Sequence, residues 1–267
     1  MTKIIILPFL CLFASLSAAP TREAFALEER PITGVPTDAF ELSDSNLTIE
    51  LWARSPMIYS PVAMDFDAQG RLWTTEGIDY QRGRRIAEGR SIIVLEDKDW
   101  DGKADTSTIF VTEKEIRHAA LGIAVFDNQI VLSSTPSIIV YTDVNRNAVF
   151  DEGVDKREVF LTGFRDASHD HTLHAVVGAP SGQWHFSYGN RGADITTKDG
   201  RHHISGCYYG YSDGIGKKSS DGEVYVGGMT MRINPDGTGL TPTGENMRNS
   251  HDMFVSSYGD IYQSDND

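Results

Sequence analysis

Short strand–turn–strand patterns recur along this chain and constrain its fold more than any other feature. Each joins two runs of β-branched and aromatic residues through a turn of Gly, Asn, Asp or Pro, which is typical of a β-hairpin. Four such hairpins occupy residues 64–73, 123–132, 175–186 and 253–262, and no segment shows a sustained helical period. Their spacings of about 58, 54 and 77 residues slightly exceed one propeller blade. We interpret each as the last hairpin of its repeating unit.

A second repeat indicates the same architecture. The run Ile92–Leu95, followed by Asp97, recurs 46 residues later as Ile138–Tyr141, followed by Asp143. Two independent repeats predict an all-β chain with a β-propeller fold, and a β-sandwich with coincidental hairpins is the alternative. Four hairpins predict about four blades, so we expect a six-bladed parent protein whose propeller is truncated at the C-terminus here.

The N-terminus has the pattern of a secretory signal peptide. Lys3 provides the positive charge, Ile4–Leu16 the apolar core and Ser17–Ala19 the small residues before cleavage. The apolar run is short for a membrane span of about 20 residues, although a membrane anchor is the competing interpretation. The sequence therefore predicts a signal peptide at 1–19, a linker at 20–44 and a propeller at 45–267. We expect an exported protein, periplasmic or associated with the cell envelope, without a transmembrane segment in the mature chain.

Charge and cysteine content narrow the partners and the sources of stability. The formal net charge is −14 at pH 7, which disfavours nucleic acid and anionic membranes because phosphate binding needs clustered Lys and Arg. The chain has two cysteines, Cys11 and Cys207, and the first lies within the predicted signal peptide. The mature chain therefore cannot form an intrachain disulfide, and bound metal ions are another source of stability.

Two loops that follow the matching strands are rich in oxygen ligands. Residues 97–105 place carboxylates at loop positions 1, 3, 5 and 9 around Gly102, as in the first half of an EF-hand loop, but Thr108 replaces the expected Glu. Residues 143–151 keep this spacing with two amides, and Ala148 replaces the glycine, so binding should be weaker. We predict structural Ca²⁺ sites, with a metal-free Asx-rich turn as the alternative. The predicted ligands are Asp97, Asp99, Asp101, Asp105, Asp143, Asn145, Asn147 and Asp151.

The segment 168–174, Ser-His-Asp-His-Thr-Leu-His, is the densest cluster of titratable groups in the chain. On a strand, His169 and His171 would face one side and Asp170 the other. A histidine titrates near neutral pH and can take a proton from an alcohol, which makes the segment a candidate catalytic site. A metal site and satisfied structural histidines are the alternatives.

Several motifs resemble those of quinoprotein sugar dehydrogenases. Asp170–His171, Pro180–Gly182 and Gly189–Asn190 resemble the active-site blade of soluble glucose/sorbosone dehydrogenases. Further along, 234–237 and 247–249 resemble their Pro-Asp-Gly strand and their Arg-Asn cofactor clamp. The N-terminal half is still more similar to a relative of that family, the membrane-bound dehydrogenase domain of planctomycetes and verrucomicrobia. The motifs shared with that relative are 61–63, 70–73, 76–80, 95–105, 137–139 and 263–267, and the whole resemblance covers about residues 45–267.

This resemblance implies a propeller whose central mouth holds pyrroloquinoline quinone (PQQ), with Ca²⁺ polarising the quinone. His171 would be the general base on the hydroxyl of a sugar or related alcohol, supported by Asp170, and hydride would pass to the quinone. Arg248 and Asn249 would contact the quinone oxygens, where a guanidinium stabilises developing negative charge. The partners implied are a small sugar or polyol substrate and a cytochrome c electron acceptor.

One departure from the family bears on catalysis. Asn190 stands where the sugar dehydrogenases have an Asp that orients the catalytic histidine; an amide can orient an imidazole but cannot stabilise an imidazolium by charge. The sequence Gly-Ala-Pro at 178–180 also replaces Gly-Pro-Asp. Two alternatives therefore stay open. One is a non-catalytic, Ca²⁺-stabilised propeller that binds polysaccharide or protein, favoured by Asn190 and the tyrosine-rich segment 207–211. The other is a metal-dependent propeller hydrolase.

Overall fold

The computed structural model describes residues 40–77, 89–113, 116, 120–165, 170–207 and 216–266. All of them lie in one unit, Ile32–Asp267. The predicted signal peptide and most of the predicted linker lie outside the described residues. The described part of the chain contains seventeen β-strands and no helix, so it offers no helix that could span a bilayer.

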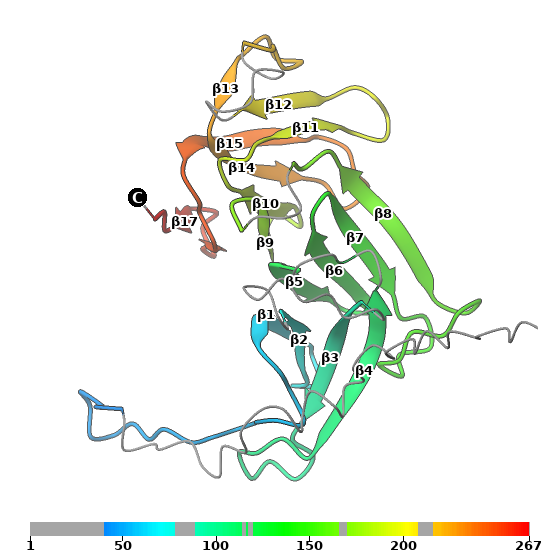
Figure 1. The fold of residues 1–267 in the computed structure, drawn as a ribbon, viewed down its shortest axis with the longest axis vertical. Coiled ribbons are helices and arrows are strands. Elements are labelled where there is room, and N and C mark those ends of the chain that lie inside the picture. Colours follow the sequence, from blue (N-terminus) through cyan, green and yellow to red (C-terminus); the bar gives the residue numbers. More distant parts are fainter. Residues whose placement is uncertain are drawn as a thin grey trace, which may run out of the picture. The chain divides into compact units, whose positions relative to one another are not determined.

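Three four-stranded antiparallel sheets follow one another along the chain (Figure 1). The first consists of β1 (Pro61–Phe66), β2 (Leu72–Glu76), β3 (Arg90–Glu96) and β4 (Thr106–Glu113). The second consists of β5 (Gly122–Phe126), β6 (Gln129–Ser134), β7 (Ser137–Thr142) and β8 (Lys156–Thr162). The third consists, in spatial order, of β9 (Leu173–Gly178), β10 (Trp184–Tyr188), β14 (Gly228–Ile233) and β15 (Thr241–Met247).

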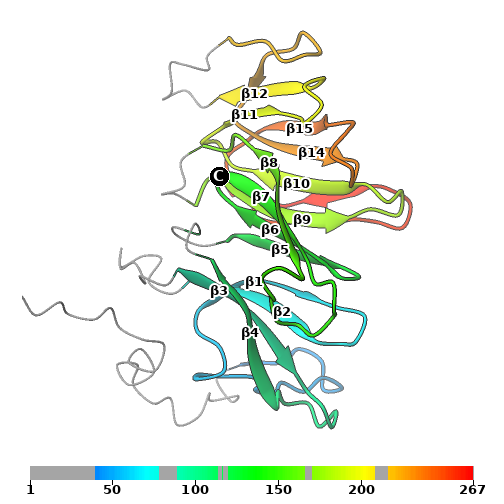
Figure 2. The same ribbon diagram turned by 90° about the vertical axis from the view of Figure 1, so that its right-hand side faces the viewer.

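Two smaller sheets complete the described structure. A hairpin of β16 (Met253–Val255) and β17 (Ile261–Gln263) follows the third sheet in sequence. Between β10 and β14 the chain inserts a three-stranded sheet of β11 (Ala193–Thr196), β12 (His203–Cys207) and β13 (Tyr225–Val226). Figure 2 shows β11 and β12 beside β14 and β15, in agreement with contacts of β12 to β14 and of β13 to β15.

The middle sheet buries both of its faces, which explains its continuous apolar runs. In β7, Ile138 and Val140 belong to the core shared with the third sheet, which includes Phe186. The alternating residues Ile139 and Tyr141 belong to the core shared with the first sheet. Because neighbouring side chains on a strand point to opposite faces, a strand buried on both faces must be apolar at every position.

The first strands of successive sheets lie side by side. A Cβ atom on Gly122, at the start of β5, would collide with the backbone of His174 at the start of β9. The ring of His174 lies 4.5 Å, between centroids, from that of His251, just before β16, and β1 packs beside β5. These strands line a common cavity of about 630 Å³. Antiparallel sheets that pack face to face around their first strands form a β-propeller, which confirms the predicted fold class.

The predicted hairpins are present, but their place within each sheet differs from the prediction. The first three form the first two strands of their sheets instead of the last two, and the fourth is a two-stranded sheet by itself. The outer strands carry exposed polar residues; β8, for example, exposes Lys156–Val159. Because the apolar pattern of the outer strands is weaker, only the inner hairpins could be recognised in the sequence.

Candidate active site

His171 and Asn190, which the sequence placed in one site, are hydrogen-bonded to each other. His171 Nδ1 lies 2.9 Å from Asn190 Oδ1. Because an amide oxygen only accepts hydrogen bonds, Nδ1 carries the proton, and Nε2 is the basic nitrogen of the neutral ring. The backbone fixes this pair, since the N–H of Arg191 donates to the carbonyl of His171 (3.1 Å). The arrangement gives His171 the tautomer that a general base at Nε2 requires.

A third loop, after β15, brings Arg248 and Asn249 to the same place. The N–H of Asn190 donates to the carbonyl of Arg248 over 2.8 Å. The carboxylate of Asp265, after β17, accepts the backbone N–H groups of both Arg248 (2.8 Å) and Asn249 (2.7 Å). Burial alone would raise the pKa of Asp265, but hydrogen bonds from backbone N–H groups lower it. Arg248 Nη1 also donates to the side-chain oxygen of Asn266 (3.0 Å).

His174 and His251 extend this cluster. His174 is fully buried, with 0% of its surface exposed, and its Nε2 lies 2.6 Å from Asn249 Oδ1. Burial and, to a lesser extent, the nearby His251 lower the pKa of His174 to about 4, although the bond to Asn249 and the charge of Asp170 oppose the shift. His174 is therefore neutral at physiological pH. Asp170 lies in this neighbourhood, and His169 lies outside the described residues.

Close backbone packing at Gly189 holds the loops together. A Cβ atom there would lie 2.6 Å from Asn249 Oδ1 and 2.7 Å from the carbonyl carbon of His171. Both distances are too short for any side chain, so this position requires glycine. Gly189 lets the His171 and Asn249 loops approach each other.

Asn249 and Arg248 form the donor set that a quinone cofactor would contact. Asn249 is 3% exposed, and its Oδ1 and backbone N–H have protein partners. Among the described residues, no acceptor contacts its Nδ2 group. An amide NH₂ group beside a guanidinium suits a ligand with acceptor oxygens, so these residues fit a quinone that carries carbonyl and carboxylate groups. The large cavity borders the cluster at His251 but does not reach His171. We therefore define the candidate site by its side chains and not by the cavity.

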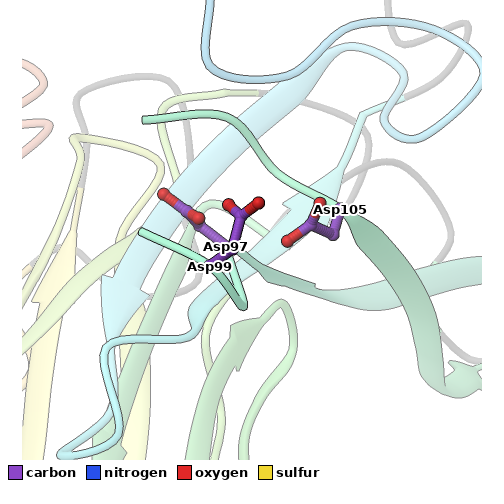
Figure 3. A group of neighbouring side chains, drawn as sticks. All are labelled: Asp97, Asp99 and Asp105. Atoms are coloured by element: carbon purple, nitrogen blue, oxygen red, sulfur yellow. The ribbon is translucent and has the colours of Figure 1, made fainter. Parts of the chain in front are cut away.

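The first acidic loop brings three of its four predicted ligands together (Figure 3). Carboxylate oxygens of Asp97, Asp99 and Asp105 all lie within 4.8 Å of one another. Asp101 is not part of this group; its Oδ1 accepts the N–H of Lys103 (2.9 Å). Nearby, Lys98 pairs with Glu96 (Nζ to Oε2, 4.0 Å). Three converging carboxylates repel one another unless a cation lies between them.

The second acidic loop has the same backbone but a different charge balance. Asp143 accepts N–H groups from Asn147 (3.2 Å) and Ala148 (2.9 Å), as Asp97 does at the matching positions of the first loop. However, the Nδ2 groups of Asn145 and Asn147 donate to Asp151 Oδ2 over 2.7 and 2.8 Å. These bonds lower the pKa of Asp151. In the second loop, the side-chain amides thus satisfy the acceptor oxygens by hydrogen bonds. In the first loop, a cation would have to do this.

Both acidic loops lie at the opposite ends of their strands from His171. β5 and β9 start together, and β7 runs in the same direction as β5, so the loop after β7 lies at the far end. In the first sheet, Thr75 at the end of β2 donates to the carbonyl of Ala120, just before β5, which places the end of β3 at the far end too. Neither loop can hold a cation that touches a ligand beside His171.

Comparisons with known proteins place the chain in a family. A family model described as a domain of unknown function (DUF7133) matches residues 37–267. The chain belongs to this family. A search of curated proteins found no match for this DUF7133 chain. The narrower resemblance to a membrane-bound domain of planctomycetes and verrucomicrobia finds no support in these comparisons.

Among solved structures, the DUF7133 chain is similar to the holo PQQ domain of pyranose dehydrogenase from Coprinopsis cinerea (TM-score 0.47, 14% identity, 77% of this chain and 43% of that one). It is also similar to a Trichoderma reesei carbohydrate-active enzyme of family AA12 (TM-score 0.36, 15% identity, 53% of this chain and 32% of that one). A third similar structure is an inactive virginiamycin B lyase from Staphylococcus aureus with quinupristin (TM-score 0.39, 13% identity, 79% of this chain and 65% of that one). The chain spans less than two thirds of each of these proteins.

Sequence reasoning missed three members of the site, His174, His251 and Asp265. His174 follows His171 by three residues, and this spacing was a signal, but its partner Asn249 lies 75 residues away. Asp265 belongs to a motif that the sequence analysis quoted without assigning it a role. Its contact with the backbone of Asn249 depends on how two loops meet, which no local pattern shows.

Proposed function

We propose that this protein is a PQQ-dependent dehydrogenase that oxidises a sugar or related alcohol. The observation that carries the proposal is that the pairs His171–Asn190 and Arg248–Asn249 lie in one cluster of loops. A hydrogen bond from the Asn190 N–H to the Arg248 carbonyl (2.8 Å) connects the two pairs. One pair supplies a base and the other supplies donors for acceptor oxygens. We further propose export to the periplasm or cell envelope and a cytochrome c as electron acceptor.

The residues divide the work by their chemistry. His171 would take the hydroxyl proton of the substrate at Nε2, because Asn190 holds the proton on Nδ1. Asp170, which the sequence paired with His171, would favour the imidazolium that results. The Nδ2 of Asn249 and the guanidinium of Arg248 would bind and orient the quinone oxygens. The quinone, when bound, supplies the acceptor for the hydride that leaves the substrate carbon.

We also propose that the first acidic loop binds a structural Ca²⁺ ion through Asp97, Asp99 and Asp105. Oxygen ligands at alternate positions suit Ca²⁺, and three carboxylates converge here without a side-chain amide that donates to them. Asp101 would complete the set only if it released the N–H of Lys103. The second loop satisfies Asp151 with amides, so we propose much weaker binding there.

Steady-state turnover tests the proposed function. The protein is loaded with PQQ and Ca²⁺, and dye reduction is followed with a panel of aldoses and polyols. We expect turnover in the parent and a loss of about 100-fold or more in His171→Gln, the usual range for a general base. PQQ affinity should stay unchanged in that variant. Equal turnover in the parent and in His171→Gln would refute the assigned base.

A non-catalytic sugar-binding propeller is the second candidate. The uncharged Asn190 partner favours it, because an amide orients the imidazole of His171 but adds no negative charge that would stabilise its protonated form. This candidate predicts saturable binding of a polysaccharide without PQQ uptake. The tyrosine-rich segment that also favoured it lies outside the described residues from 208 to 211.

A further inference from the structure

His174 forms a short, buried hydrogen bond to the side-chain oxygen of Asn249. The two atoms, His174 Nε2 and Asn249 Oδ1, lie 2.6 Å apart, and the residues are 0% and 3% exposed. At this depth water cannot replace the bond, so losing it would leave a buried polar group unpaired. Asn249 therefore has one strongly preferred side-chain orientation.

The proton of this bond lies on His174. The groups that face His174 are Asp170, His171, His251 and Asn249, and burial outweighs them to keep the ring neutral. A neutral ring has one N–H, and the second ring nitrogen, Nδ1, is buried without a hydrogen-bond partner. With the proton on Nε2, only a lone pair on Nδ1 is left unpaired, whereas the other tautomer would bury an unpaired N–H.

Gly189 supports the same orientation of the amide. Its α-carbon faces Asn249 Oδ1 so closely that a Cβ would lie 2.6 Å from that oxygen. A carbonyl oxygen accepts a weak hydrogen bond from a Cα–H group. In the flipped orientation, the hydrogens of the Asn249 NH₂ group would point at the hydrogens of the Gly189 α-carbon and repel them. The oxygen thus faces His174 and Gly189, and the Nδ2 group is what Asn249 offers to a ligand.

We propose that His174 is a positioning residue that fixes Asn249 as a hydrogen-bond donor, so that the site selects ligands whose facing atoms are acceptor oxygens. This inference rests on the proposed function and deepens it, because quinone carbonyl and carboxylate oxygens are acceptors only. A ligand that presents only hydrogen-bond donors at this point, such as an ammonium group, would leave the Asn249 N–H groups unpaired.

Two variants of His174 separate positioning from packing. His174→Gln retains a side-chain N–H donor, whereas His174→Phe fills the space without one. PQQ is titrated into the calcium-loaded parent and each variant, with folding checked by near-ultraviolet circular dichroism. We expect His174→Phe to weaken PQQ binding about tenfold or more and His174→Gln to stay within about threefold, in line with the loss or retention of one buried hydrogen bond.

A double-mutant cycle and a cofactor-free spectrum complete the test. In an Asn249→Ala background, His174→Phe should cause no further loss of affinity, because the effect passes through Asn249. In the parent without PQQ, the imidazole ¹⁵N spectrum should show His174 protonated at Nε2.

The outcomes are distinguishable. Binding by the parent with equal affinity in His174→Phe would overturn the inference and leave the proposed function standing. Additive losses in the cycle would overturn it as well, since they indicate packing alone. If the parent does not bind PQQ, the proposed function fails, and the ¹⁵N spectrum then decides. The Nε2–H tautomer supports the positioning of Asn249, and the Nδ1–H tautomer overturns it.

Discussion

Removing the imidazole of His174 should flatten the dependence of stability on pH. The pKa of His174 is about 4 in the folded chain, against 6.5 for an ordinary histidine. The unfolded chain therefore binds the proton more tightly than the folded chain, and the free energy of unfolding falls as the pH falls below 6.5. Because a pKa difference of one corresponds to about 1.4 kcal/mol, the loss attributable to His174 is about 2 kcal/mol at pH 5 and about 3 kcal/mol at pH 4.

The assay is urea unfolding of the parent and His174→Gln at pH 7.5, 6, 5 and 4. Both proteins retain Asp170, His171 and His251, which face the ring, and His185, whose pKa burial also lowers. The difference between the two proteins therefore reports the His174 side chain together with its interactions with these neighbours. We expect the stability of the parent to approach that of the variant by about 2 kcal/mol between pH 7.5 and pH 5. Parallel curves would refute the claim that His174 is neutral and buried.

Three further predictions follow from the structure. Gly163→Ala should destabilise the protein by about 2 kcal/mol more than Gly153→Ala, measured by urea unfolding, because both have positive φ but only Gly163 has backbone in the space of a Cβ. Asp99→Asn should weaken Ca²⁺ binding about tenfold or more, followed by the fluorescence of the exposed tryptophan in the same loop, whereas Asn145→Ala should leave it unchanged. Asn190→Asp should raise dehydrogenase turnover about tenfold or more, because a carboxylate stabilises the imidazolium of the base; a decrease with intact folding would contradict this.

The fold was predictable where burial imposes a local pattern. Runs such as Ile138–Tyr141 are apolar at every position because both faces of the strand are buried, and short turns mark the inner hairpins. The order of strands within a sheet was less accessible. The outer strand β8 alternates weakly because only Phe160 and Leu161 are buried in it, so its pairing with β7 left little trace in the sequence.

The candidate site was predictable only in part, because its contacts join distant loops. The family resemblance named His171, Asn190, Arg248 and Asn249, and the structure brings these four residues together. No sequence pattern reported that the oxygen of Asn249 is taken by His174.

Spacing alone was also insufficient in the acidic loops. It predicted four ligands in each, yet Asp101 turns to the backbone of Lys103 in the first loop. In the second, the amides of Asn145 and Asn147 donate to Asp151. Whether a polar side chain donates or accepts is settled by geometry and not by its position in a motif.

The two ends of the sheets have separate proposed roles. The acidic loops connect the third strand to the outer strand of the first two sheets at one end, where a cation would join β3 to β4. The loops with His171, Asn190 and Arg248 meet at the other end. Loss of calcium should therefore lower stability without changing the chemistry of the base. Binding of the ion at 100 times its Kd would stabilise the fold by about 2.7 kcal/mol.

Anaerobic single turnover separates binding of the quinone from its reduction through His171. The calcium-loaded protein is saturated with PQQ, freed of excess cofactor and mixed with an aldose or polyol, and the absorbance of the bound quinone is followed. We expect one quinone bound per chain, its reduction by substrate in the parent, and unreduced quinone in His171→Gln over the same time. A folded, calcium-loaded parent that binds no quinone, or whose bound quinone no substrate in the panel reduces, would contradict the proposed function.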